Sequence, residues 1–170
     1  MKERAKRLWI FVGIYIILIY TTIPIARGLL NFLYLKIGKD ALYILLSAMS
    51  VAGILLFFYY ERTWNLEWKR ITAFVFLLFF FVVTMQLIEI PEEKMHILEY
   101  GFLGILVYKG YKISKHPLLR AVVFVGAIGI GDEFIQWLLP NRVGEIKDIG
   151  FNFLGGIFGI LAIAIHDKKI

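Results

Sequence analysis

The chain is predicted to be an all-α polytopic membrane protein, a bundle of about six transmembrane helices with both termini in the cytoplasm. Hydrophobic residues make up 60% of its 170 residues, whereas they make up about half of a soluble domain. They gather in runs close to the roughly 20 residues that a helix needs to cross the hydrocarbon of a bilayer. The lysine and arginine residues, which produce a net charge of +6, flank these runs.

The N-terminal half of the chain is expected to hold three spans. The first, 8–26, follows a basic start but is too long for a cleaved signal peptide, so we interpret it as a retained signal anchor that ends near Pro24. Residues 29–37 are expected to extend it or to form a helix lying flat at the interface. The next two spans are expected at 41–60 and 71–90.

The C-terminal half is expected to hold three more spans. The run 95–111 is short and interrupted by glycines, and we favour a full crossing over a re-entrant segment. Further spans are expected at 118–139 and 149–165. In the last one, Gly155 and Gly159 form a small-xxx-small pair, which favours close packing against another helix.

The distribution of basic and aromatic residues predicts the orientation. Six spans place both termini on one side, and that side collects most of the 19 lysine and arginine residues, Arg62 among them. By the positive-inside rule this side is cytoplasmic. Trp9 and Trp64 then lie at the inner interface, and Tyr20 and Trp137 at the outer one, as aromatic belts require.

Several classes of function are excluded by what the sequence lacks. It has no cysteine, which excludes disulfides, thiol nucleophiles and cysteine-ligated zinc. It has no Gly-x-Ser-x-Gly elbow, phosphate loop or dinucleotide fingerprint. The basic residues flank apolar runs and form no stripe with aromatics, so no nucleic-acid partner is expected. We expect one domain over 1–170.

The stretch 131–156 combines polar side chains with an apolar background. Its polar residues of interest are Asp132, Glu133, Gln136, Arg142, Asp148 and Asn152. The first three share one helix face, the last two share a face of the next helix, and the arginine lies in the turn between them. Ionisable residues in membrane segments usually face a bundle interior or a wet cavity, so this stretch is a candidate functional site.

A second polar group opens the span 95–111. It consists of Glu92, Glu93, His96, Glu99 and Tyr100. With six spans, this group lies at the same outer end of the bundle as the stretch 131–156, so three helices are expected to converge on one outward-facing polar pocket. Glu93 precedes His96 by three residues, and the two are expected to pair on one face.

These residues carry a resemblance to a known family. The segments P-E-E-K-M-H-x-x-E-Y-G-x-L from Pro91, D-E-x-x-Q at Asp132 and N-R-x-G-x-x-x-D-x-x-x-N-x-x-G from Asn141 resemble the ordered motifs of the VanZ-like family, over about 91–160. The resemblance implies a multi-pass protein of the plasma membrane and cell envelope. The family's namesake is associated with low-level resistance to the glycopeptide teicoplanin. The resemblance implies no established reaction.

The sequence supports candidate roles for these residues. The candidate catalytic residues are His96, Asp132 and Glu133. The candidate substrate-binding residues are Glu93, Glu99, Tyr100, Gln136, Arg142, Asp148 and Asn152. The expected partner is a membrane lipid or a lipid-linked cell-wall intermediate. Cofactors, metal dependence and oligomeric state stay open, although carboxylates, an imidazole and an amide carbonyl suit Mg, Mn or Zn.

Three classes of function remain. One is an enzyme acting on a lipid head group, with His96 or Glu133 as acid–base and Arg142 holding phosphate or carboxylate. Another is a non-catalytic protein that binds an envelope lipid or a lipoglycopeptide. A transporter ranks last, because the acidic residues gather at one face. A structural alternative is a buried ion pair of Asp132 and Glu133 with Arg142.

Overall fold

The computed structural model describes residues 2–61, 67–140 and 142–167, and its regular secondary structure there is entirely α-helical. The predicted all-α class is confirmed. The five helices are α1 (Lys2–Glu61), α2 (Trp68–Leu87), α3 (Pro91–Tyr111), α4 (Pro117–Leu138) and α5 (Ile146–His166). The predictions made for Arg62, Trp64 and Asn141 fall outside the described residues.

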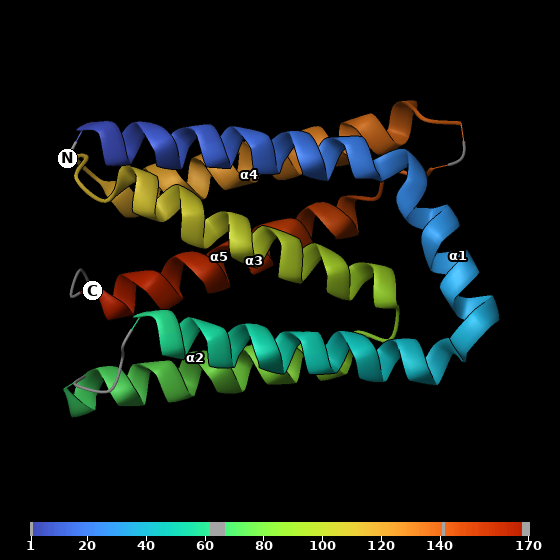
Figure 1. Ribbon diagram of the computed structural model, residues 1–170, viewed down its shortest axis with the longest axis horizontal. Helices are drawn as coiled ribbons and strands as arrows, with labels where there is room; N and C mark the ends of the chain where they lie inside the picture. The colour runs from blue at the N-terminus through green and yellow to red at the C-terminus, as the bar shows by residue number, and fades with distance from the viewer. Residues whose placement is uncertain (1, 62–66, 141, 168–170) are drawn as a thin grey trace.

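Helix α1 covers the elements expected in the N-terminal part of the chain: residues 29–37 extend the first helix, and a break at Gly38 separates them from the part that contains 41–60. Its first part runs along the long axis of the bundle, its middle crosses the end of the bundle, and its last part returns along the axis (Figure 1). Gly38 interrupts it with φ 80° and ψ 165°, a conformation that a residue with a Cβ rarely adopts. The helix does not end near Pro24 as expected but continues through it.

Prolines set the starts of α3 and α4. Pro91 and Pro117 occupy first-turn positions, where the missing N–H costs no hydrogen bond. Helix α3 therefore begins four residues before the expected span, and its first turn includes Glu92 and Glu93. Carboxylates at that position interact favourably with the helix dipole. The bounds of α2, α4 and α5 differ from those of the expected spans by a few residues.

Helices α3 and α5 pack backbone to backbone through glycines. A Cβ atom added to Gly155 would lie 2.7 Å from the Cα of Ile97, and one added to Gly159 would lie 2.8 Å from the carbonyl carbon of Gly101. This confirms the close packing predicted for Gly155 and Gly159. The two helices approach so closely because neither glycine presents a side chain.

The buried core lies among the first part of α1, α3, α4 and α5, whereas α2 is mostly exposed. Core residues include Val12, Leu103, Val125 and Ile163. Within the described residues, three helices are long and apolar enough to cross a membrane, namely α1 over Ala5–Tyr60, α2 and α5. The chain is therefore a membrane protein. The six-span count and the cytoplasmic termini stay predictions.

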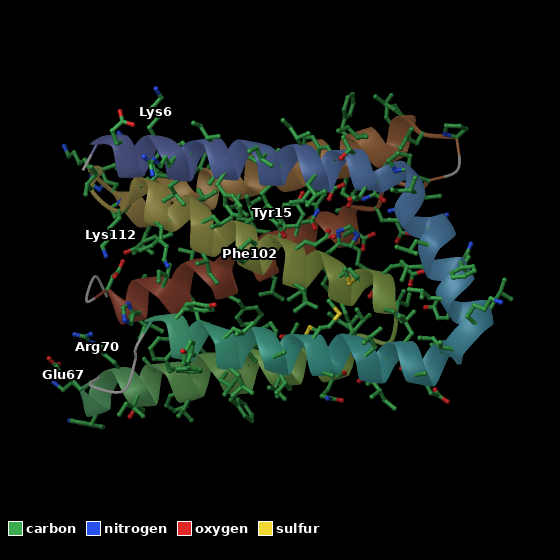
Figure 2. The ribbon with its side chains drawn as sticks, viewed as in Figure 1. Lys6, Tyr15, Glu67, Arg70, Phe102 and Lys112 are labelled. Carbon is green, nitrogen blue, oxygen red and sulfur yellow. The ribbon has the colours of Figure 1, made fainter. Side chains whose placement is uncertain are left out.

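One end of the bundle carries the first residues of α1 and the last residues of α5 (Figure 1). Lys6, Arg70 and Lys112 lie at this end (Figure 2). The ammonium of Lys112 is 2.7 Å from a carboxylate oxygen of Asp167. Basic residues thus lie at the end of the bundle that carries both the first residues of α1 and the last residues of α5. The starts of α3 and α5 and the end of α4 lie at the opposite end.

Candidate functional site

The end of the bundle away from the termini holds nearly all of the buried polar side chains in the described part of the chain. Apart from Ser50, these are Glu93, Lys94, His96, Asp132, Glu133, Gln136 and Asn152. They come from the first turns of α3, the last turns of α4 and the first turns of α5. The three helices converge on one polar group, as predicted, whereas an outward-facing pocket at this place stays a prediction. We call His96, Tyr100, Asp132, Glu133, Gln136 and Asp148 the polar cluster.

Asp132 lies at the centre of the polar cluster and is only 2% exposed. The hydroxyl of Tyr100 donates to its Oδ2 over 3.1 Å, and the amide of Gln136 approaches its Oδ1 at 3.3 Å. The spacing of Asp132 and Gln136 along α4 allows the second contact, because residues four apart share a helix face. Two neutral donors thus hold the carboxylate in place.

Glu133 is 4% exposed and is fixed by two hydrogen bonds. The amide of Gln136 donates to its Oε1 over 2.8 Å, and the backbone N–H of Glu145 donates to its Oε2 over 3.1 Å. The second bond ties the loop between α4 and α5 to α4. This loop lies close against the helix, since a Cβ atom on Gly144 would be 3.0 Å from that of Trp137.

His96 lies between two carboxylates. Its Nδ1 is 3.9 Å from Oδ2 of Asp132, and its Nε2 is 3.8 Å from Oδ2 of Asp148. Both distances exceed a direct hydrogen bond, and Nδ1 is buried without a hydrogen-bond partner. The expected pair of Glu93 with His96 is wrong, because Glu93 instead forms a salt bridge with Lys147 of α5.

Arg142 lies in the loop between α4 and α5, and no described residue forms a salt bridge with it. Its Nε is buried without a hydrogen-bond partner. Partial burial, and after it the charge of Arg27, lowers the pKa of the guanidinium, while the charges of Asp132 and Glu133 act in the opposite direction. The predicted alternative, a structural ion pair of these carboxylates with Arg142, is therefore not found among the described residues.

Asn152 and Glu99 border the polar cluster. Asn152 is completely buried, and its amide lies 3.3 Å from the carbonyl oxygen of Gly129 in α4. A Cβ atom on Gly129 would lie 2.9 Å from the Cβ of Asn152, so this glycine allows the contact. Glu99 is half-buried and interacts electrostatically with Asp132 and Arg142. Asn152 joins two helices, whereas Glu99 adds a further carboxyl group beside the polar cluster.

Lys94 also lies at this end of the bundle, although it is not one of the candidate site residues. It is 1% exposed, and its ammonium donates to the carbonyl of Met85 over 2.6 Å. The same nitrogen lies 3.5 Å from the centre of the Tyr43 ring. Lys94 thus connects the first turn of α3 to α1 and α2. The sequence signal that could have placed Lys94 within the bundle is Pro91, because a helix that starts at this proline includes Lys94 in its first turn.

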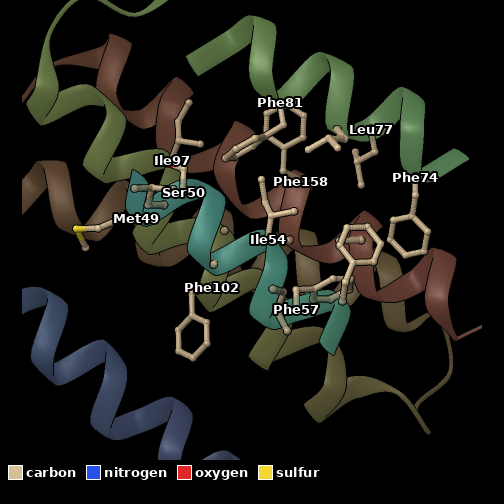
Figure 3. Close-up of a pocket in the computed structure, with 18 residues that line it drawn as sticks. Met49, Ser50, Ile54, Phe57, Phe74, Leu77, Phe81, Ile97, Phe102 and Phe158 are labelled. Atoms are coloured by element: carbon tan, nitrogen blue, oxygen red, sulfur yellow. The ribbon is translucent and has the colours of Figure 1, made fainter. Parts of the chain in front are cut away.

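A separate cavity of about 210 Å³ lies on a different face of α3 (Figure 3). Its lining includes Ile54, Phe57, Phe81, Ile97 and Phe158, which come from α1, α2, α3 and α5. The hydroxyl of Ser50, which also lines the cavity, already donates to the carbonyl of Leu46 over 2.8 Å. The cavity is therefore apolar and suits hydrocarbon rather than water.

The polar cluster has the donor atoms of a metal site. One ligand atom each from His96, Asp132 and Glu133 lies within 4.8 Å of the others. The same three side chains can also exchange protons with a bound molecule, because an imidazole and carboxylates are common general acids and bases.

The part of the chain that is similar to a known protein family is the part that forms the polar cluster. The family model described as VanZ/LLP1 matches residues 90–166, which include α3, α4 and α5. No curated protein and no solved structure matches the chain. The resemblance inferred from the sequence motifs is confirmed over residues 90–166, which are similar to the VanZ/LLP1 family.

Proposed function

We propose that this protein binds the head group of a membrane lipid or of a lipid-linked cell-wall intermediate at the polar cluster. The observation that carries the proposal is the burial of Asp132, Glu133 and His96 together in an apolar bundle. Burying ionisable groups within a membrane is costly and usually marks a functional site. The polar cluster offers the charged and hydrogen-bonding groups that recognition of a polar head group needs.

Arg142 and the apolar cavity support a lipid as the ligand. A guanidinium suits phosphate or carboxylate, because its planar donors match two oxygens at once. The cavity, at about 210 Å³, exceeds the roughly 150 Å³ of an apolar cavity known to take benzene. A hydrocarbon chain would therefore fit on one face of α3 while the head group occupies the other.

The proposed function includes an orientation in the membrane. In this proposal the protein crosses the plasma membrane six times, with both termini in the cytoplasm and the polar cluster facing outward. The basic residues Lys6, Arg70 and Lys112 at the end with the termini support it (Figure 2). A single cysteine at position 142 should react with a membrane-impermeant reagent added outside intact cells. Labelling of position 142 only from the cytoplasm would contradict this orientation.

The binding proposal is tested by native mass spectrometry of the purified protein in detergent with total envelope lipid extract. The wild-type protein should retain one class of lipid through dissociation of the micelle. Glu133→Gln should lose that lipid, while Glu92→Gln, a carboxylate at the same end that accepts a hydrogen bond from Tyr34, should keep it. Equal lipid retention in all three proteins would contradict the proposal.

A role in glycopeptide tolerance follows from the family and is proposed on that ground. Expression of the wild-type protein in a sensitive host should raise tolerance to teicoplanin. Glu133→Gln at equal protein level should not. Equal tolerance with the wild-type protein and with an empty vector would contradict this role.

A second candidate function is acid–base catalysis on the bound head group. The observation that favours it is the position of His96, with one ring nitrogen facing Asp132 and the other facing Asp148. An imidazole flanked by carboxylates can take up and release a proton at the site of reaction. Mass analysis of the retained lipid distinguishes the two functions, since an enzyme converts it and a binding protein returns it unchanged.

A further inference from the structure

The polar cluster contains more negative than positive charge. Asp132 and Glu133 are buried and Asp148 is half-buried. In the described part of the chain, none of them forms a salt bridge with a lysine or an arginine. A buried carboxylate without a compensating charge is strongly unfavourable. The cluster therefore requires either protonation or a cation.

The positions of the donor atoms favour a cation. His96 is 8% exposed, and its Nδ1, which has no hydrogen-bond partner, faces Asp132 at 3.9 Å. One ligand atom from each of His96, Asp132 and Glu133 lies within 4.8 Å of the others. An ion about 2.0–2.2 Å from each ligand needs ligand atoms no more than about 4.4 Å apart, so a small inward movement of these side chains would complete the site. An unpartnered imidazole nitrogen thus faces the carboxylate of Asp132, and the carboxylate of Glu133 lies in the same group of ligand atoms.

The neighbours of these three residues resemble the outer contacts of a metal site. The second ring nitrogen of His96 faces Asp148 at 3.8 Å, and a metal-bound histidine commonly directs its other N–H at a carboxylate. Gln136 holds Glu133, and Tyr100 holds Asp132. Such contacts fix the orientation of ligands before an ion binds.

We propose that His96 through Nδ1, Asp132 and Glu133 bind a divalent transition-metal ion, with Asp148 orienting the imidazole. One imidazole with two carboxylates suits Mn²⁺ or Zn²⁺ better than Ca²⁺ or Mg²⁺, which prefer oxygen alone. Three protein ligands leave at least one position open for a further ligand. The ion shares the polar cluster with the proposed lipid head group, but its binding does not require that lipid.

The metal proposal is tested on full-length protein in detergent, stripped with a chelator and separated from lipid. After incubation with Mn²⁺ or Zn²⁺ and gel filtration, elemental mass spectrometry should find one equivalent of metal in the wild-type protein. Glu92→Gln should bind as much as the wild type. Asp132→Asn and His96→Gln should retain none. Asp148→Asn should bind about 10–100-fold more weakly, because it removes an outer contact.

Folding is checked by the melting temperature and by elution as a single species. The two ligand variants change different helices, so retention of the fold by either one is sufficient for the comparison. Equal metal in wild-type protein and in a folded ligand variant would overturn the proposal. Absence of metal together with specific retention of a lipid would overturn the metal site while leaving the proposed function intact.

Discussion

One face of α3 has a polar environment and another has an apolar one, although residues of the two faces are neighbours in the sequence. His96 and Tyr100 belong to the polar cluster, whereas Ile97 and Gly101, each one residue further on, line the apolar cavity. A step of one residue rotates the side chain by about 100° in a helix of 3.6 residues per turn. One helix therefore has a polar face and an apolar face, and a rotation of α3 about its axis would change which residues lie on each.

The glycines between α3 and α5 fix this rotation. Gly101 meets Gly159, and Ile97 meets Gly155, with no side chain of α5 between the two backbones. Close backbone contact leaves little freedom for one helix to turn against the other. Both faces of α3 depend on the same contact, so disrupting it should affect the polar cluster and the cavity together.

The largest effect is expected for Gly155→Leu. Since even a Cβ atom at this position would lie 2.7 Å from the Cα of Ile97, α3 and α5 would have to separate. Overpacking in a core costs about 1–3 kcal/mol where side chains can adjust, and more where backbone is met. We expect most of the folded protein to be lost, as measured by fluorescence-detected gel filtration.

Gly13→Leu is the matched control, because no atom lies within 4 Å of a Cβ at Gly13. It should elute as the wild type does. Normal elution of Gly155→Leu would show that the contact between α3 and α5 does not hold the two faces in place.

The next largest effect is expected from a substitution in the polar cluster alone. Glu133→Gln removes a charge but keeps an oxygen that can accept from Gln136 or from the N–H of Glu145. We expect a stability loss of only about 1–2 kcal/mol, normal protein levels and loss of glycopeptide tolerance. Arg142→Gln in the same chain should not restore tolerance.

Rescue by the double substitution would instead indicate a structural ion pair, whose disruption costs about 3–5 kcal/mol. Unchanged tolerance at normal protein levels would remove Glu133 from the site.

A smaller effect should come from filling the cavity. Gly53 lines it and has no atom within 4 Å of an added Cβ, so Gly53→Leu should place a side chain in the cavity without unfolding the protein. Retention of the lipid should fall while metal binding at the polar cluster stays unchanged. Gly13→Leu, in the same helix away from the cavity, serves again as control. Loss of metal binding in Gly53→Leu would indicate that the two faces are not independent.

The smallest effect is expected for Tyr100→Phe, which removes the hydroxyl that donates to Asp132 over 3.1 Å. Loss of one hydrogen bond costs about 0.5–1.5 kcal/mol, and here Gln136 remains as a second donor to Asp132. We expect a lower melting temperature, weaker metal binding and an unchanged content of bound hydrocarbon. A melting temperature equal to that of the wild type would show that this hydrogen bond contributes nothing.

The sequence predicted the helical class and the convergence of α3, α4 and α5, because charge is rare in apolar runs and spacing places it on helix faces. It did not predict the partner of Glu93, since Lys147 lies 54 positions away and only tertiary packing joins them. The continuity of α1 through Pro24 and the cavity were also missed. A cavity arises from side chains of several helices, and no pattern within one helix encodes it.

The two faces of α3 are tested most directly by photo-crosslinking with two forms of the lipid that the protein retains, one reactive at its head group and one at the end of its hydrocarbon chain. The head-group probe should attach within 93–100 or 129–148, around the polar cluster. The chain probe should attach within 49–58 or 74–81, where α1 and α2 line the cavity. Attachment of the head-group probe to the cavity segments, or of both probes to the same segments, would contradict the assignment of one face to charge and the other to hydrocarbon.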